Sequence, residues 1–247
     1  MIVFAAIAPH GDLDGEVDGV RELRAAMEEL GRRFDEAAPE TTVVVTPHSV
    51  HVEGHLGVVI AGRVGEIATD RTLADAVLAA LRADGIPALG VSYGGNDPVE
   101  AELPMDWGTE IPLAFMAAER IVVVGPARDR TLAEHVRAGA AIARATGTRR
   151  VALIASADHG HAHDPDGPYG FDPAAAGYDG LLREILASGR LDFTPLGRLV
   201  DAAKADSLWQ LLVLQGAVGD GASVDLLAYA APTYFGMLCA EVRTKRS

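Results

Sequence analysis

Three histidines and two aspartates lie within one short loop, Ser156-Ala157-Asp158-His159-Gly160-His161-Ala162-His163-Asp164-Pro165. The apolar run Val151–Ala155 precedes this loop and is typical of a buried strand. Imidazole and carboxylate groups bind metal ions and carry protons near neutral pH. Loops at strand ends are also where a rigid scaffold presents such groups. A histidine-rich surface loop is the alternative interpretation, and this stretch alone does not separate the two.

Two further histidines each follow a proline at the end of a strand-like run. Ile2–Ala8 ends at Pro9-His10, and Thr41–Thr46 ends at Pro47-His48. The proline stiffens each turn and directs the chain out of the strand. If these strands are parallel, their loops lie at one edge of the sheet, where open α/β sheets bind ligands. His10 and His48 then converge with a histidine of the third loop.

Two imidazoles and one carboxylate with open coordination positions form a site that suits non-haem Fe(II). Zn(II) accepts the same ligands together with a bound water. We therefore expect Fe(II), with Zn(II) or Mn(II) as alternatives.

These residues need a scaffold in which strands and helices alternate. The hydrophobic pattern predicts further strands at Ala88–Ser92 and Ile121–Val124 and a hairpin of Leu56–Ile60 with Val64–Ala68. Helices are predicted over Val20–Ala37, Thr72–Ala83, Arg130–Thr146 and Asp206–Val218, and within Phe171–Ser188. With no linker and no repeat, residues 1–247 are expected to form a single α/β domain with a mainly parallel central sheet flanked by helices.

Composition narrows the class of protein. The 247 residues are 49% hydrophobic and 23% charged, which is ordinary for a globular chain, and the formal net charge is -14. An acidic surface argues against nucleic acid or an anionic membrane as a partner. The one cysteine, Cys239, excludes an intrachain disulfide and favours a reducing compartment. No signal sequence or apolar stretch of membrane-spanning length is evident, so we expect a soluble cytoplasmic protein.

Several stretches together resemble a known family. Ala8-Pro9-His10, Thr46-Pro47-His48, the run from Met105 to Leu113, Ser156–His161 and the run from Pro168 to Pro173 occur in the order found in class III extradiol ring-cleavage dioxygenases. The chain resembles their catalytic (LigB-type) subunits and the related Memo-like proteins. The resemblance implies a LigB-like fold and an Fe(II) site that opens a catechol-type aromatic diol with O2, as in the catabolism of aromatic compounds.

The resemblance also implies roles for single residues. His10 and His48 match the two histidine ligands, and His161, three residues after Asp158, matches the acid/base histidine. The family places a Glu, or in Memo a Cys, ahead of an apolar helix, and Asp206 stands at that place here. An aspartate in this position is also a common N-cap, and Glu241 is the alternative third ligand.

Expected roles can also be given to other residues near these motifs. We place Trp107, Asp158 and His159 at the substrate. His159 and His163 have no role in the resemblance and, as loop residues, are expected to be solvated. His135 is expected to be partly exposed on its helix. Glu110 is expected to be a structural carboxylate or one that contacts the metal ligands without binding the metal itself.

One residue departs from the family pattern. Many ring-cleaving members have Asp-His-Gly where this chain has Asp106-Trp107-Gly108. Trp107 cannot transfer protons, although it can stack on an aromatic ring. Two hypotheses follow: an extradiol dioxygenase, or a Memo-like metal-binding protein without ring cleavage; a zinc hydrolase is a distant third. As partners we expect a small aromatic diol and O2 and a second copy of the chain in a homo-oligomer, and the resemblance also allows a small second subunit.

Overall fold

The computed structural model describes residues 1–94 and 96–244. Its strands are β1 (Ile2–Ala8), β2 (Thr41–Val45), β3 (Leu56–Val59), β4 (Arg63–Val64), β5 (Ile67–Thr69), β6 (Ala88–Val91), β7 (Glu102–Leu103), β8 (Arg120–Gly125), β9 (Val151–Ser156), β10 (Ser223–Ala230) and β11 (Met237–Arg243). Its helices are α1 (Asp18–Ala37), α2 (Arg71–Ala83), α3 (Trp107–Leu113), α4 (Leu132–Ala145), α5 (Pro173–Ser188), the 3-10 helix η1 (Thr194–Arg198), α6 (Val200–Ala203) and α7 (Leu208–Val218).

A large, mainly parallel sheet forms the centre of the molecule. Its strand order is β10-β11-β1-β9-β2-β8-β5-β4-β7, and β3 joins β8 to β6 beside this path. The four central strands β1, β9, β2 and β8 are parallel and closely in register: Ile7 lies opposite Ala155, Ala155 opposite Val45, and Val45 opposite Val124. Because these strands end at the same level, the loops that follow them leave the sheet along one edge.

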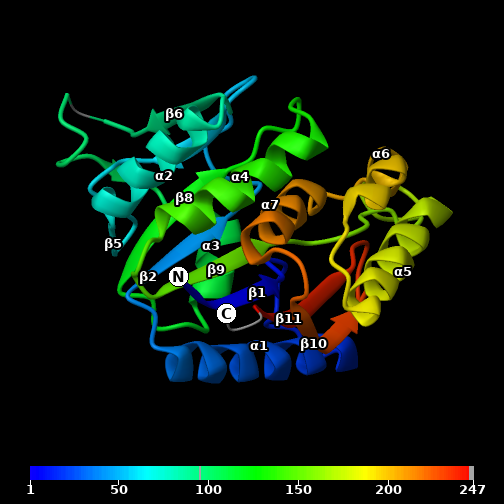
Figure 1. The fold of residues 1–247 in the computed structure, drawn as a ribbon. Coiled ribbons are helices and arrows are strands. Elements are labelled where there is room, and N and C mark those ends of the chain that lie inside the picture. The colour runs from blue at the N-terminus through cyan, green and yellow to red at the C-terminus, as the bar shows by residue number, and fades with distance from the viewer. Residues whose placement is uncertain (95, 245–247) are drawn as a thin grey trace.

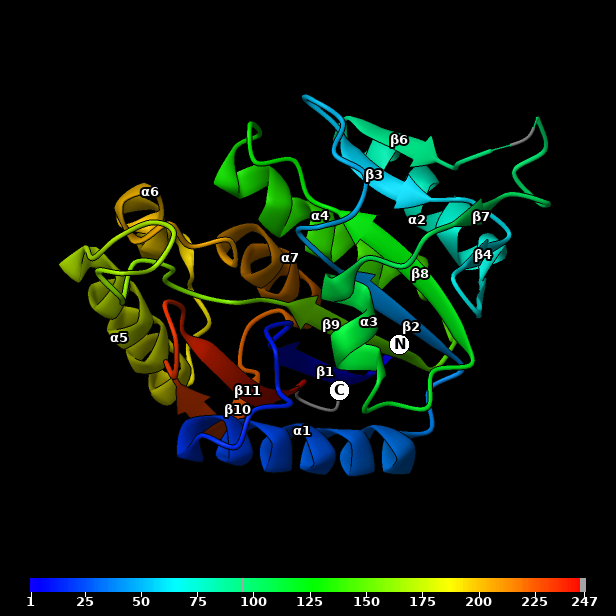
Figure 2. The ribbon, with the colours of Figure 1, turned by 180° about the vertical axis from the view of Figure 1, so that it is seen from behind.

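Both faces of the central sheet are covered by helices, which explains why its strands consist mostly of apolar or β-branched residues. Phe4 and Ala6 of β1 pack into a cluster with α1, whereas Ala5 and Ile7 face a larger cluster that contains α4 and α7. Figures 1 and 2 show α1 along one side of the sheet and α4 with α7 along the other. The predicted α/β architecture, a mainly parallel sheet flanked by helices, is confirmed.

Helices α4 and α7 pack unusually closely through two glycines. A Cβ atom on Gly139 would lie 1.9 Å from the carbonyl oxygen of Val213, and one on Gly216 would lie 1.8 Å from that of Val136. Only the absence of side chains at both positions allows the backbones to approach this far. The position of α7 is thus set by its contact with α4.

The predicted hairpin of Leu56–Ile60 with Val64–Ala68 is wrong. Strand β3 pairs instead with β6 in parallel and with β8 in antiparallel. The hairpin that forms is shorter, β4 with β5, where Val64 pairs with Ile67 around Gly65, whose φ is +52°. The hairpin therefore forms around the tight turn at Gly65, whose backbone conformation glycine adopts easily, and not around the longer connection at Ala61–Arg63. No helix of the described chain has the length and apolarity needed to cross a membrane.

Candidate metal centre

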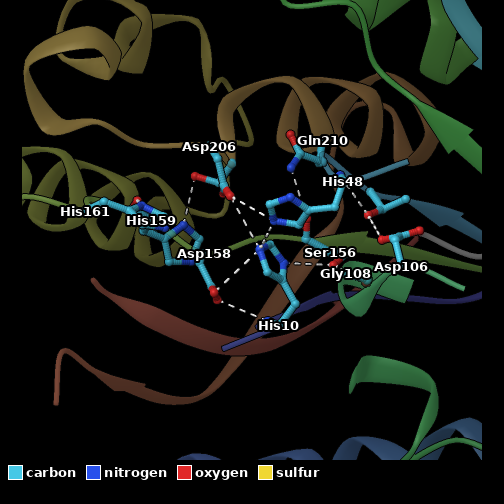
Figure 3. A network of polar contacts seen from close by, with 12 residues as sticks. His10, His48, Asp106, Gly108, Ser156, Asp158, His159, His161, Asp206 and Gln210 are labelled. Carbon is cyan, nitrogen blue, oxygen red and sulfur yellow. Dashed lines mark hydrogen bonds and ion pairs between the residues drawn. The ribbon is translucent and has the colours of Figure 1, made fainter. Parts of the chain in front are cut away.

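Three strand ends and the start of one helix meet at the carboxyl edge of the sheet. His10 follows β1, His48 follows β2, and Asp158 and His159 follow β9. Asp206 arrives from the other end of the chain, immediately before α7. Figure 3 shows the side chains of His10, His48, Asp158 and Asp206 turned toward one another.

His10, His48 and Asp206 form a compact cluster of possible metal ligands. The Nε2 atoms of the two histidines are 3.0 Å apart, and Oδ2 of Asp206 lies 3.4 Å from Nε2 of His10 and 3.6 Å from Nε2 of His48. Atoms bound to a common ion at about 2.1 Å stand about 3 to 3.5 Å apart in tetrahedral or octahedral geometry. The three atoms are thus spaced as ligands of one ion, and the cluster can hold a metal.

The environment of His10 leaves Nε2 free to act as a ligand. The hydroxyl of Ser156 donates to the carbonyl of Gly108, so at 3.0 Å it accepts the hydrogen of His10 Nδ1. This places the hydrogen on Nδ1 and directs the Nε2 lone pair at His48 and Asp206. Asp158 holds the backbone of the same residue, because its Oδ1 accepts the His10 N–H at 3.1 Å.

Asp206 is not the N-cap that its position before a helix suggests. Helix α7 begins at Leu208 after Ser207, and no side chain caps it. The Asp206 side chain points instead to the two histidines, and its second oxygen, Oδ1, is buried without a hydrogen-bond partner among the described residues. A buried carboxylate oxygen without a partner is costly unless a cation satisfies it. The alternative ligand, Glu241, is engaged by Arg33 and Arg243, each at 2.7 Å, and does not join the cluster.

The cluster shares one proton near neutral pH. Burial disfavours the charged form of His10, but the carboxylates of Asp158 and Asp206 outweigh burial and raise its pKa to about 9. Burial, together with the positive charge of His10, lowers the pKa of His48 to about 4. Burial alone would raise the pKa of Asp206, but the hydrogen bond and charge of His10 hold it below the usual value. The shared proton therefore resides on His10, between carboxylates, where a metal ion would replace it.

His48 forms the exposed side of the cluster. Its side chain is 22% exposed, against 3% for His10 and 11% for Asp206. Trp107, the first residue of α3, covers one face of His48 with ring centroids 4.2 Å apart and is itself 55% exposed. Gly108 permits this contact, because a Cβ there would lie 2.3 Å from Oγ1 of Thr46. His48 and Trp107 therefore form one exposed side of the cluster.

His161 lies on the opposite side of the cluster, beyond Asp158 and His159 (Figure 3). Its Nδ1 donates to the carbonyl of His159 at 2.6 Å, which leaves Nε2 as a proton acceptor. Its ring stacks on Phe235 at 5.2 Å, and Tyr169 meets it edge-on at 6.1 Å. This geometry suits a proton carrier in an aromatic setting.

Comparisons with known proteins identify the family and the fold of the chain. The profile of a family described as the catalytic LigB subunit of aromatic ring-opening dioxygenase matches residues 7–236. The chain belongs to the LigB family. The crystal structure of the uncharacterized protein JW3007 from Escherichia coli K12 has a TM-score of 0.67 to this chain at 18% identity. That match covers 97% of this chain and 99% of the other, and it shows the same fold. No curated protein matches the chain.

Three expectations about the exposure of histidines are wrong. His159 is fully buried, with Nδ1 3.0 Å from Oγ of Ser207, and burial lowers its pKa to about 4. His163 is only partly exposed, and its Nε2 lies 2.8 Å from Oδ2 of the buried Asp179. His135 is fully buried inside α4, where its Nδ1 bonds the carbonyl of Thr131. Glu110 is exposed and stands apart from the cluster.

The residues expected at the substrate divide into two groups. Trp107 lies at the exposed side of the LigB site, and its contact with a substrate stays a prediction. Asp158 is 2% exposed and directed at His10, and burial raises its pKa. His159 faces Ser207 in the interior. In this structure Asp158 and His159 support neighbouring residues rather than line an opening.

Sequence reasoning gave no role to three residues that organise the site. Ser156 orients His10, Asp179 anchors the histidine loop by accepting the N–H of Gly160 at 2.8 Å, and Ser207 joins His159 to Tyr178. Ser156 opens the recognised stretch Ser156–His161, so its place in that stretch was a usable signal. Asp179 and Ser207 lie far along the chain in ordinary helical contexts and carry no local signal.

Proposed function

We propose that this LigB-family chain is a non-haem Fe(II)-dependent extradiol dioxygenase that opens a small catechol-type diol with O2. The observation that carries the proposal is the arrangement of His10, His48 and Asp206, which offers two imidazoles and one carboxylate and leaves coordination positions open. The partnerless Oδ1 of Asp206 supports a resident cation. Family membership supports ring-opening chemistry.

Each residue has a defined task in this proposal. His10, His48 and Asp206 hold the ion, with Ser156 and Asp158 orienting His10. When bound, Fe(II) supplies the sites where the diol and O2 meet and the path for electron density between them. His161, whose Nε2 is free to accept, takes the proton of a substrate hydroxyl and later returns it. Trp107 shields His48 from water and offers its ring to the substrate.

A second candidate function is a Memo-like metal-binding protein without ring cleavage. Trp107 favours it, because this residue stands where many ring-cleaving members have a histidine, and indole cannot transfer a proton. The carboxylate at position 206, where Memo has a thiol, favours the enzyme. The variant Trp107→His therefore separates the two functions. If the wild-type protein is a dioxygenase that works with tryptophan at this position, the variant keeps its turnover. If the wild-type protein is inactive because it lacks the histidine, the variant gains ring-cleavage activity.

The test combines metal content with oxygen uptake. The chain is purified under anaerobic conditions, metals are quantified, and O2 consumption is measured on a panel of catechols after reconstitution with Fe(II), Zn(II) or Mn(II). We expect one ion per chain and O2 uptake with Fe(II) only. His10→Ala and His48→Ala should lose stoichiometric binding while keeping the fold, and full occupancy in both variants would remove this site from consideration.

We further propose that the protein is a cytoplasmic homo-oligomer, with or without a small second subunit. The single cysteine, Cys239, is free and buried, which suits a reducing compartment. The exposed side chains of Tyr169 and Phe171 offer apolar surface for an interface. Sedimentation analysis of the purified chain tests the assembly.

A further inference from the structure

Asp179 is a buried carboxylate that has no part in the proposed reaction. It lies within α5 and is 1% exposed. Its Oδ1 accepts the backbone N–H of Gly160 at 2.8 Å, and its Oδ2 accepts from Nε2 of His163 and from the hydroxyl of Tyr229, both at 2.8 Å. Among the residues that the structure describes, its one ion-pair partner is His163. Burial of the carboxylate is therefore compensated by hydrogen bonds from the segments that it joins.

The N–H that Asp179 binds belongs to the peptide group that orients His161. The N–H of Gly160 and the carbonyl of His159 form one peptide, which is planar and trans. In a trans peptide these two groups point in opposite directions. Asp179 accepts from the N–H on one side, and on the other side the carbonyl accepts from Nδ1 of His161 at 2.6 Å. One rigid peptide thus connects the buried carboxylate to the ring of His161.

Two glycines allow this close approach. A Cβ on Gly160 would lie 2.8 Å from the backbone of α5, and a Cβ on Gly236 would lie 2.0 Å from Oδ2 of Asp179. Gly236 belongs to the turn before β11, and its N–H donates to the carbonyl of Gly160 at 3.0 Å. The residue before it, Phe235, stacks on the ring of His161. The peptide that bonds this ring and the turn that stacks on it therefore both pack against the same carboxylate.

We propose that Asp179 is a positioning residue for His161. This inference rests on the proposed function, in which His161 takes and returns the proton of a substrate hydroxyl. A carboxylate on the N–H polarises the peptide, so its carbonyl becomes a stronger acceptor for the hydrogen on Nδ1. The hydrogen is thereby kept on Nδ1, and Nε2 keeps its lone pair for the substrate. Asp179 acts across one peptide group, whereas in a Ser-His-Asp triad the carboxylate bonds the histidine directly.

The first test replaces Asp179 by asparagine, which has the same size but one acceptor oxygen in place of two. Three donors converge on the carboxylate, so at least one of them is left facing the amide NH2. With a catechol that supports oxygen uptake, Asp179→Asn should lower kcat of the Fe(II)-loaded protein about 10- to 100-fold, as expected of a misplaced catalytic group. KM and metal content should change little, because Asp179 lies outside the metal cluster.

A double variant shows whether Asp179 acts through His161. If it does, Asp179→Asn should lower kcat no further in the His161→Ala protein, because the group that it positions is already absent. A role confined to stability would lower kcat by the same factor in both backgrounds. Tyr229→Phe is the matched control, because it removes a donor to the same carboxylate but leaves the bond to Gly160. It should lower Tm and leave kcat almost unchanged.

A second measurement does not depend on turnover. In the diamagnetic Zn(II)-loaded protein with 15N-labelled histidine, NMR of the two ring nitrogens of His161 reports its tautomer, and His161→Ala assigns the signals. Wild type and Tyr229→Phe should carry the hydrogen on Nδ1, whereas Asp179→Asn should show a mixture of both tautomers. Asp179→Ser, which is too short to reach the N–H of Gly160, takes its place if the asparagine variant does not fold. The wild-type tautomer is informative in either case.

The outcomes separate this inference from the proposed function. A changed tautomer in Asp179→Asn without oxygen uptake on any catechol supports the positioning role, and in that case the dioxygenase activity fails alone. Three results would each overturn the inference: hydrogen on Nε2 of His161 in wild type, an unchanged tautomer in a folded Asp179 variant, or an equal loss of kcat in both backgrounds.

Discussion

The hydroxyl of Ser156 decides which nitrogen of His10 faces the metal cluster. It donates to the carbonyl of Gly108 and must therefore accept from Nδ1 of His10, whatever the charge of the ring. The proton that His10 gains or loses is consequently the one on Nε2, which lies 3.0 Å from Nε2 of His48. The carbonyl of Gly108, acting through the hydroxyl of Ser156, thus orients His10 as a possible metal ligand.

Metal binding should release about one proton per ion below pH 9. Without metal, the carboxylates around His10 hold its pKa at about 9 against the opposing effect of burial, whereas His48, with a pKa of about 4, is already neutral. Since the ion replaces the proton of His10, affinity should rise about tenfold per pH unit up to about pH 9 and then level. Calorimetry in buffers of different ionisation enthalpy measures this release. Affinity that does not change between pH 6 and pH 8 would contradict it.

His161→Ala should keep the metal and lose most turnover. General acid/base catalysis contributes about 10²- to 10⁴-fold, which sets the expected loss in kcat. The matched control is His55→Ala, outside the cluster, which should change kcat little. Metal content and a pH–rate profile are measured for each variant, and the limb due to one imidazole should vanish only in the His161 variant. If His161→Ala loses the metal, His161 is a ligand and the role of Asp206 must be reassigned.

At the scale of the elements, α7 carries Asp206 to histidines that lie near the other end of the chain. Its place depends on α4, because Gly139 and Gly216 let the two helix backbones touch. A capping box at Thr131 and Glu134 fixes the start of α4 in turn. Asp206 is therefore positioned by the packing of α7 on α4 as well as on the sheet.

Gly139→Ala should destabilise the protein and weaken metal binding together. The added Cβ would lie 1.9 Å from the carbonyl oxygen of Val213, so α7 must move away, at a cost of about 1–3 kcal/mol for an overpacked contact. Gly180→Ala on α5 is the control, because its Cβ meets no atom within 4 Å and it should be neutral or stabilising. Chemical denaturation and metal titration of both variants test this. Unchanged metal affinity in a destabilised Gly139→Ala protein would show that α7 does not control the cluster.

At the scale of the whole molecule, the cluster ties together segments near residues 10, 48 and 206. A ligand that binds only the folded state stabilises it by RT ln(1 + [L]/Kd), about 2.7 kcal/mol at 100 times Kd. For a chain of this length we expect Tm to rise by about 5–10 °C. Thermal denaturation under anaerobic conditions with Fe(II) measures the rise, and His10→Ala should abolish it. An equal rise in that variant would place the bound ion elsewhere.

The sequence by itself determined the central sheet and the meeting of two histidines. The runs Ile2–Ala8 and Thr41–Thr46 are apolar or β-branched throughout because helices cover both faces of a parallel sheet, and this pattern is local and readable. Parallel strands in register must end at one edge, so the endings Pro9-His10 and Pro47-His48 were sufficient to predict that His10 and His48 approach each other. Their roles as ligands, like that of Asp206, remain predictions that metal analysis will test.

Only the tertiary structure decided which polar residues are buried and what they face. His135 and His159 each follow an acidic residue in the sequence, yet both are fully buried, because burial depends on elements that arrive from elsewhere in the chain. From the sequence, Asp206 fits the position of an N-cap as well as that of a metal ligand. Only the hydrogen bonds at the start of α7 show that its side chain does not cap the helix. The hairpin failed for the same reason, since β3 found its partners in β6 and β8, which follow more than 25 residues later. Contacts between segments that are distant in the sequence produce no periodic pattern of residues. They are therefore determined only by how the helices and strands pack.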